Sequence, residues 1–215
     1  VTLAAGEFNP TLDAGIIALP GMAVTKSGRT TGTTNGTVSA VNLTVLVSYG
    51  SCGVARFVNQ VSITPGTFSG PGDSGSAILD ANSMKPVGLL FAGSSTQTIA
   101  NQMLFVYLIL RVVPEGEVPA AATEQRVAQL AQDVYARHPR IQALQRVQRN
   151  AETDLFRIAG VHGVGIARAD EARDDGEYAL LVYADRVTAS LRRAVMSRLA
   201  GQRVRIVEQP RFRAF

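Results

Sequence analysis

The residues that could carry chemistry gather in one short run, Pro71-Gly72-Asp73-Ser74-Gly75-Ser76. A serine hydroxyl becomes a useful nucleophile when a tight turn holds it and backbone N–H groups point at the charge that develops on the substrate oxygen. Glycines on both sides of Asp73 and Ser74 permit such a turn and leave room for a substrate. The run therefore predicts that Ser74 is a nucleophile. The alternative interpretation of the same run is an ordinary Gly/Ser surface turn between strands.

The segments around this run predict an all-β first half. They are short, rich in Val, Thr, Ile and Tyr, and separated by Gly, Asn, Ser and Pro. Strands are expected over 22–26, 37–40, 43–49, 55–63, 76–79, 86–91 and 101–107. Their spacing is typical of a Greek-key barrel or a sandwich.

Apolar residues follow helical periods in much of the second half. Helices are expected over 127–134 and 141–158, strands over 161–167 and 178–183, a helix from the cap Thr188 to the stop Gly201, and a last strand around Val204 and Ile206. This order, helix-helix-strand-strand-helix-strand, predicts a small α+β sandwich with helices on one face of a sheet.

A change of composition separates the two halves. Residues 1–113 hold nine charged residues and fourteen glycines, whereas the remaining 102 residues hold 29 charged residues and six glycines. Residues 114–122 lie at the change, and their prolines and glycine predict a linker. We therefore expect two domains, over 1–113 and 123–215.

Three segments of the first half have sequences and an order along the chain that can be compared with known protein families. They are residues 21–38, with Gly28-Arg29-Thr30-Thr31-Gly32 at their centre, the run around Ser74, and Pro86-Val87-Gly88-Leu89-Leu90-Phe91-Ala92-Gly93-Ser94. Together they resemble the second β-barrel of chymotrypsin-like serine proteases, as in bacterial streptogrisins and glutamyl endopeptidases, and the trypsin-like family of the plant narrow-leaf proteins. The resemblance covers roughly residues 10–113, about half of the chain.

The resemblance implies roles for individual residues. Ser74 matches the nucleophile, and the backbone amides of Gly72 and Ser74 match the oxyanion hole. Asp13, followed by an apolar segment, matches the triad aspartate, and its alternative role is to cap a turn. Asp73 belongs to the nucleophile motif with a structural role.

The resemblance also implies a substrate cleft. Phe68, six residues before the serine, matches the floor of the pocket for the side chain at the cleaved position, and Phe91, Ala92 and Gly93 match the strand beside the cleft. No carboxylate lies near Phe68 in the sequence to pair with lysine or arginine. The implied preference is a small or apolar residue at the cleaved position.

The base of the triad has no match in the chain. The triad needs a histidine, which in this family precedes the aspartate on a first barrel, and no residue before Asp13 is histidine. We therefore expect the first barrel to be largely missing and a separate or upstream barrel to supply the histidine. The two histidines present, His138 and His162, follow the predicted linker.

Three functional hypotheses follow. The first is a serine endopeptidase that cleaves peptide or protein substrates and is incomplete without an N-terminal segment bearing the histidine. The second, from another class, is a catalytically inactive, protease-like binding or regulatory module. The third is an enzyme in which His162 acts as the base.

Composition excludes several other classes. Although the formal net charge is +4, acidic residues are interspersed among the basic ones and aromatic residues make up only 6%, so no nucleic-acid partner is expected. The longest apolar run, 103–110, is too short to cross a membrane. With two histidines and one cysteine, no metal and no cofactor are expected. No signal peptide is recognised, and localisation stays open between the cytoplasm and secretion.

Overall fold

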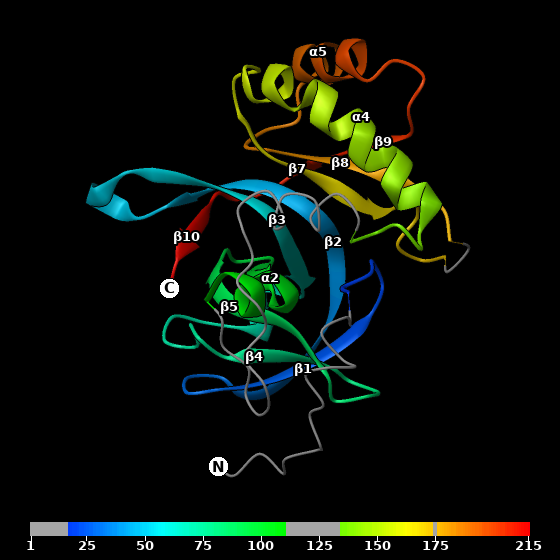
Figure 1. The fold of residues 1–215 in the computed structure, drawn as a ribbon. Helices are drawn as coiled ribbons and strands as arrows, with labels where there is room; N and C mark the ends of the chain where they lie inside the picture. The colour runs from blue at the N-terminus through cyan, green and yellow to red at the C-terminus, as the bar shows by residue number, and fades with distance from the viewer. Residues whose placement is uncertain (1–16, 111–133, 174–175) are drawn as a thin grey trace.

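A computed structural model describes residues 17–110, 134–173 and 176–215, which are mostly β-sheet with few helices (Figure 1). The first half contains β1 (Ala23–Gly28), β2 (Gly32–Ser48), β3 (Val54–Thr64), β4 (Ala77–Asp80), β5 (Pro86–Gly93), β6 (Thr98–Gln102) and α2 (Met103–Leu110), with short 3-10 turns at Gly50–Cys52 and Gly66–Phe68. The second half contains α4 (Pro139–Phe156), β7 (Val161–Arg168), β8 (Tyr178–Ala184), α5 (Ala189–Arg198), β9 (Val204–Glu208) and β10 (Phe212–Ala214).

The ten strands of the described residues belong to one sheet. Hydrogen-bonded neighbours follow the order β1-β4-β5-β6-β3-β2, and β1 also pairs with β2. From β2 the sheet continues through β7, β8 and β9, and α4 covers β7 and β8. Figure 1 shows α4 and α5 together on the side of β7–β9 that faces away from the first half. The two halves therefore share a continuous sheet.

The long strand β2 makes this continuity possible. It pairs with β1 near its start, with β3 along most of its length, and with β7 over Ala40–Val45. The register of the β2–β3 pair shifts at three places between Val38 and Val45, and Asn42 has a φ of 49°. Such bulges bend a strand, and asparagine tolerates the left-handed conformation better than most residues. Strands expected over 37–40 and 43–49 are thus one bent strand.

The strand predicted over 101–107 is wrong in its second part. β6 ends at Gln102, and Met103 begins the helix α2. Methionine and leucine, which are frequent in this segment, favour helices. Burial of the Phe105 and Tyr107 side chains stabilises the short helix. None of the helices within the described residues is long and apolar enough to cross a membrane.

The other expected elements that fall within the described residues are found, and the structure adds one strand, β10. The helix predicted from Thr188 is confirmed, because Thr188 Oγ1 accepts a hydrogen bond of 3.1 Å from the N–H of Leu191. The helix expected over 127–134 lies almost wholly outside the described residues. β10 was not expected.

Buried amide side chains join α4 to the bend in β2. Asn42 Nδ2 donates to Gln148 Oε1 at 3.0 Å, and Gln145 Nε2 donates to Asn42 Oδ1 at 3.0 Å. Gln148 Nε2 also donates to the carbonyls of Asn42 (3.0 Å) and Val164 (3.1 Å), on β2 and β7. These bonds satisfy the carbonyls that the irregular pairing exposes at the bend.

Replacing Gln148 with leucine should lower the free energy of unfolding by about 3 kcal/mol, because it leaves buried polar groups of Asn42 and Val164 without partners. Urea denaturation measures the change. The matched control is Arg149→Ala at the next, exposed position of α4, which should change stability by less than about 0.5 kcal/mol. Equal losses for both variants would contradict this role of Gln148.

Candidate functional site

Ser74 lies on an exposed turn between the 3-10 turn at Gly66–Phe68 and β4. The N–H of Asp73 donates to the carbonyl of Gly70, and the N–H of Ser76 donates to the carbonyl of Asp73, both at 3.0 Å. Gly72 has a φ of 97°, in the region that favours glycine. A Cβ there would lie 2.5 Å from the hydroxyl oxygen of Thr30, which is held by a hydrogen bond to the carbonyl of Pro71. The turn therefore needs glycine at Gly72 for both conformation and space.

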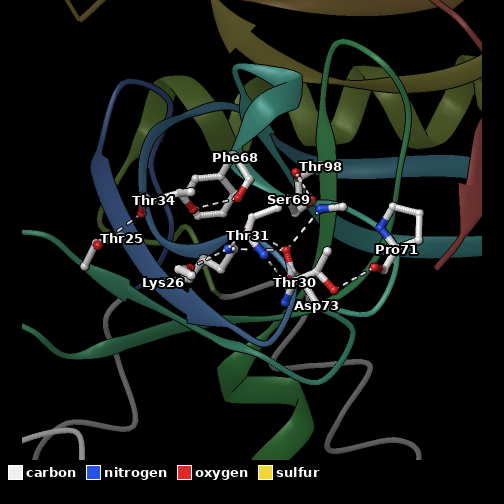
Figure 2. A network of polar contacts seen from close by, with 12 residues as sticks. Thr25, Lys26, Thr30, Thr31, Thr34, Phe68, Ser69, Pro71, Asp73 and Thr98 are labelled. Carbon is white, nitrogen blue, oxygen red and sulfur yellow. Dashed lines mark hydrogen bonds and ion pairs between the residues drawn. The ribbon is translucent and has the colours of Figure 1, made fainter. Parts of the chain in front are cut away.

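The carboxylate of Asp73 is fully buried and points toward Thr30 and Thr31 of the β1–β2 turn (Figure 2). Its Oδ1 accepts the N–H groups of Thr30 (2.7 Å) and Thr31 (3.2 Å). Its Oδ2 accepts the hydroxyl of Thr31 (2.6 Å) and the N–H of Gly70 (3.0 Å). These bonds fasten the Ser74 turn to the β1–β2 turn.

The charge that balances Asp73 is Lys26, on β1. Its Nζ lies 3.4 Å from Asp73 Oδ2, and neither side chain has any exposed surface. Lys26 also donates to the hydroxyl of Thr31 and to the carbonyl of Gly32. Burial alone would raise the pKa of Asp73, but the hydrogen bonds from Thr31, Thr30 and Gly70 outweigh it and hold the pKa well below its usual range. Asp73 is thus a buried anion at neutral pH.

The hydroxyl of Ser74 faces two backbone carbonyls. Its Oγ lies 3.2 Å from the carbonyl oxygen of Phe215 and 3.4 Å from that of Phe91. Among the hydrogen bonds of the described residues, none uses the amide N–H of Gly72 or of Ser74. The turn therefore presents a hydroxyl and two free backbone donors on one short segment.

A groove runs beside this turn along β5. Its cavity of about 570 Å³ is lined by Gly66, Ser69, Pro71, Gly93, Ser94 and Ser95 from the first half, and by residues near the C-terminus. β10 forms one wall of this cavity and pairs with β5, with Arg213 opposite Gly93 and Ala214 opposite Ala92. The structure therefore brings Ser74 and Gly72 together with Phe91, Ala92 and Gly93 around a length of extended backbone.

Phe68 is placed differently. It is buried beneath the turn, its carbonyl accepts the hydroxyl of Thr34 at 2.6 Å, and its ring centroid lies 5.7 Å from Lys26 Nζ. It is not among the residues that line the groove cavity. Asp13 lies outside the described residues.

Neither histidine contacts Ser74 in the part of the chain that the structure describes. His162, on β7, is fully buried, and its Nε2 donates to the carbonyl of Gln209 at 2.9 Å. Its ring packs against Tyr183 and Phe212, with centroids 6.4 and 6.0 Å away. His138 precedes α4 as its N-cap residue. Neither side chain is therefore placed to act as a base for Ser74.

Two features of the site were not predicted from the sequence. Lys26 is one of only two lysines and falls inside a predicted strand next to the buried Val24, which signals a buried charge in need of a partner. The C-terminal run Arg211-Phe212-Arg213-Ala214 alternates polar and apolar residues, which is the strand period. The sequence does not indicate that Lys26 pairs with Asp73 or that the C-terminal strand pairs with β5.

A family model for the Nal1 C-terminal domain matches residues 6–104, just under half of the chain. Comparison with curated protein sequences gives no significant match.

Among solved structures, the chain is similar to a glutamic acid-specific serine protease (32% identity, TM-score 0.35), covering 45% of this chain and 49% of the protease. A chymotrypsin from Cellulomonas bogoriensis is 26% identical over 45% of this chain and 50% of its own, with a TM-score of 0.36. A Nocardiopsis protease is 21% identical over 43% and 47%, with a TM-score of 0.35. The chain thus spans about half the length of these proteases.

The variant Lys26→Met should lower the free energy of unfolding by about 3–5 kcal/mol, because it leaves Asp73 as a buried charge without its counter-ion. Adding Asp73→Asn removes that charge, so the double variant should lose less than the sum of the single losses. Urea denaturation of the four proteins measures this coupling. Arg192→Ala, on the exposed face of α5, is the control, and strictly additive losses would contradict the buried pair.

The stability of the protein should fall as the pH drops through about 6.5, the pKa of histidine in the unfolded chain. Burial lowers the pKa of His162, so the unfolded chain takes up a proton near pH 6.5 that the folded chain refuses. His162→Gln should flatten the dependence of unfolding free energy on pH. His138→Gln is the matched control, and an unchanged slope in His162→Gln would overturn this assignment.

Proposed function

We propose that this chain carries the nucleophile half of a serine endopeptidase. In this proposal β1–β6 are the second, Greek-key barrel of a chymotrypsin-like protease within residues 1–113, and residues 123–215 are an accessory α+β domain after the linker 114–122. The pairings of β1–β6, which return from β2 to β1, and the family match over 6–104 support it.

The observation that carries the proposal is the position of the Ser74 hydroxyl. It lies 3.2 Å from the carbonyl oxygen of a backbone segment that pairs with β5, and the turn beneath it is fixed through Asp73. This contact is a hydrogen bond from the hydroxyl to a main-chain oxygen, and it places Ser74 beside the backbone of a segment that pairs with β5, which is the position a nucleophile needs relative to a bound peptide. The substrate class that fits is therefore an extended peptide laid against β5.

In the proposed reaction, Ser74 Oγ attacks the carbonyl carbon of the peptide while its proton passes to a histidine base. The amides of Gly72 and Ser74 stabilise the oxyanion. Collapse of the intermediate returns the proton to the amine that leaves, and water then releases the acyl group. Since neither His138 nor His162 reaches Ser74, the proposal places the base, oriented by Asp13, on a separate or upstream barrel.

A fluorophosphonate probe should label Ser74 in a longer chain that includes the upstream coding sequence. Ser74→Ala should abolish labelling and peptide hydrolysis, while Ser76→Ala, two residues away on the same turn, should keep both. The 215-residue chain alone should hydrolyse peptides about 10⁴-fold more slowly, because it lacks the base.

Two other outcomes decide between the hypotheses. Full activity in the short chain that is lost with His162→Ala would establish His162 as the base and overturn the proposal. Absence of labelling in the longer chain would instead favour the inactive binding module.

A further inference from the structure

The last strand of the chain covers the strip of β5 from Phe91 to Gly93 next to Ser74, and this strip is named the β5 groove. Residues Phe212 and Arg213 of β10 pair in parallel with β2, and Arg213 and Ala214 pair antiparallel with β5. Figure 1 shows β10, in red, leaving the α-containing half and ending beside β5, where the C-terminus is marked. Adding a strand to an exposed sheet edge is a general way of binding an extended peptide. β10 is such a strand, supplied by the same chain.

Phe215 contacts β5 and Ser74 through its backbone and Gly93 through its ring, as a residue of a bound peptide would. Its N–H donates to the carbonyl of Phe91 at 3.3 Å, and its carbonyl oxygen lies 3.2 Å from Ser74 Oγ. Its ring lies over Gly93, where an added Cβ would come within 2.4 Å of the ring carbon Cζ. The absence of a side chain at Gly93 therefore makes room for an aromatic ring.

Arg211 and Phe212, which precede the tail, are anchored by contacts with residues outside β5. Phe212 is fully buried against Tyr183 and His162. Arg211 donates two hydrogen bonds to the Asp185 carboxylate, from Nε to Oδ1 at 2.8 Å and from Nη2 to Oδ2 at 2.6 Å. By contrast, Ala214 and Phe215 are only half-buried. The anchor therefore holds the end of the chain at the groove without depending on the last two residues.

We propose that residues 213–215 are an intramolecular ligand of the β5 groove, and that this groove binds extended peptides with an aromatic residue at the position of Phe215. The proposal rests on the proposed function only where it assigns Phe215 the place of the residue before the cleaved bond. A tethered ligand acts at an effective concentration of the order of millimolar. An external peptide must displace it, so the tail inhibits the site.

The test is binding of a fluorescein-labelled Phe-Arg-Ala-Phe peptide to the 215-residue chain, followed by fluorescence anisotropy. Phe215→Ala removes the ring and Phe215→Pro removes the N–H that bonds to Phe91, and both should bind the peptide at least about ten-fold more tightly than the unaltered chain. Met196→Ala, at an exposed apolar residue of α5, is the control and should bind like the unaltered chain. A peptide ending in alanine should bind more weakly to every protein.

Equal affinity of the unaltered chain and both Phe215 variants, or no binding by any of them, would overturn the proposal. The thermal unfolding midpoint of each variant shows that it is folded, and Phe215→Ala and Phe215→Pro alter different contacts. Peptide binding needs no catalytic base, so it separates this inference from the enzyme. Probe labelling of the longer chain is measured both with and without Phe215→Ala, because the tail would keep the probe away from Ser74. A response of peptide binding to the variants without labelling of either longer chain would leave a binding groove that is filled by the chain's own tail. Labelling without a response of peptide binding would leave only the protease function.

Discussion

The arrangement of the site depends on one buried ion pair, Asp73 with Lys26. Removing two charges from water is costly, and it is tolerated only where each keeps its hydrogen bonds and its counter-ion. Asp73 meets this condition only when three segments are in contact: the Ser74 turn, the β1–β2 turn that donates hydrogen bonds to it, and β1, which carries Lys26. A shift of the turn would leave the carboxylate unsatisfied. The neighbouring Ser74 is thereby held outward, with its amide free.

The bent strand β2 and the strand β10 relate this turn to the rest of the molecule. β2 carries the sheet into the α-containing half, and Asn42 with Gln148 fixes its bend. β10 returns from that half to the groove, anchored at Phe212 and Arg211. The second half thus has a physical role at Ser74 although no catalytic side chain reaches there from it. That role is to supply a length of backbone to β5.

Local patterns predicted most of the elements and the turn at Ser74, because strand and helix periods, caps and glycine turns are properties of neighbouring residues. They failed where distant residues decide. Asn42 was interpreted as a break because its partner Gln148 lies over a hundred residues away. Lys26 gave no indication of Asp73, and the alternation around Phe212 did not reveal that it pairs with β5. Helix α2 was expected as a strand because its apolar run is short enough for either.

The chain's own backbone lies along β5, with the main-chain oxygen of Phe215 at the Ser74 hydroxyl. Amide hydrogen exchange of Phe215, followed by NMR, tests it most directly, because its N–H is bonded to the carbonyl of Phe91. We expect exchange at least about 100-fold slower than in an unstructured peptide, in step with the neighbouring amides of β5. Exchange of the Phe215 amide at the rate of an unstructured chain, with β5 still protected, would contradict the claim.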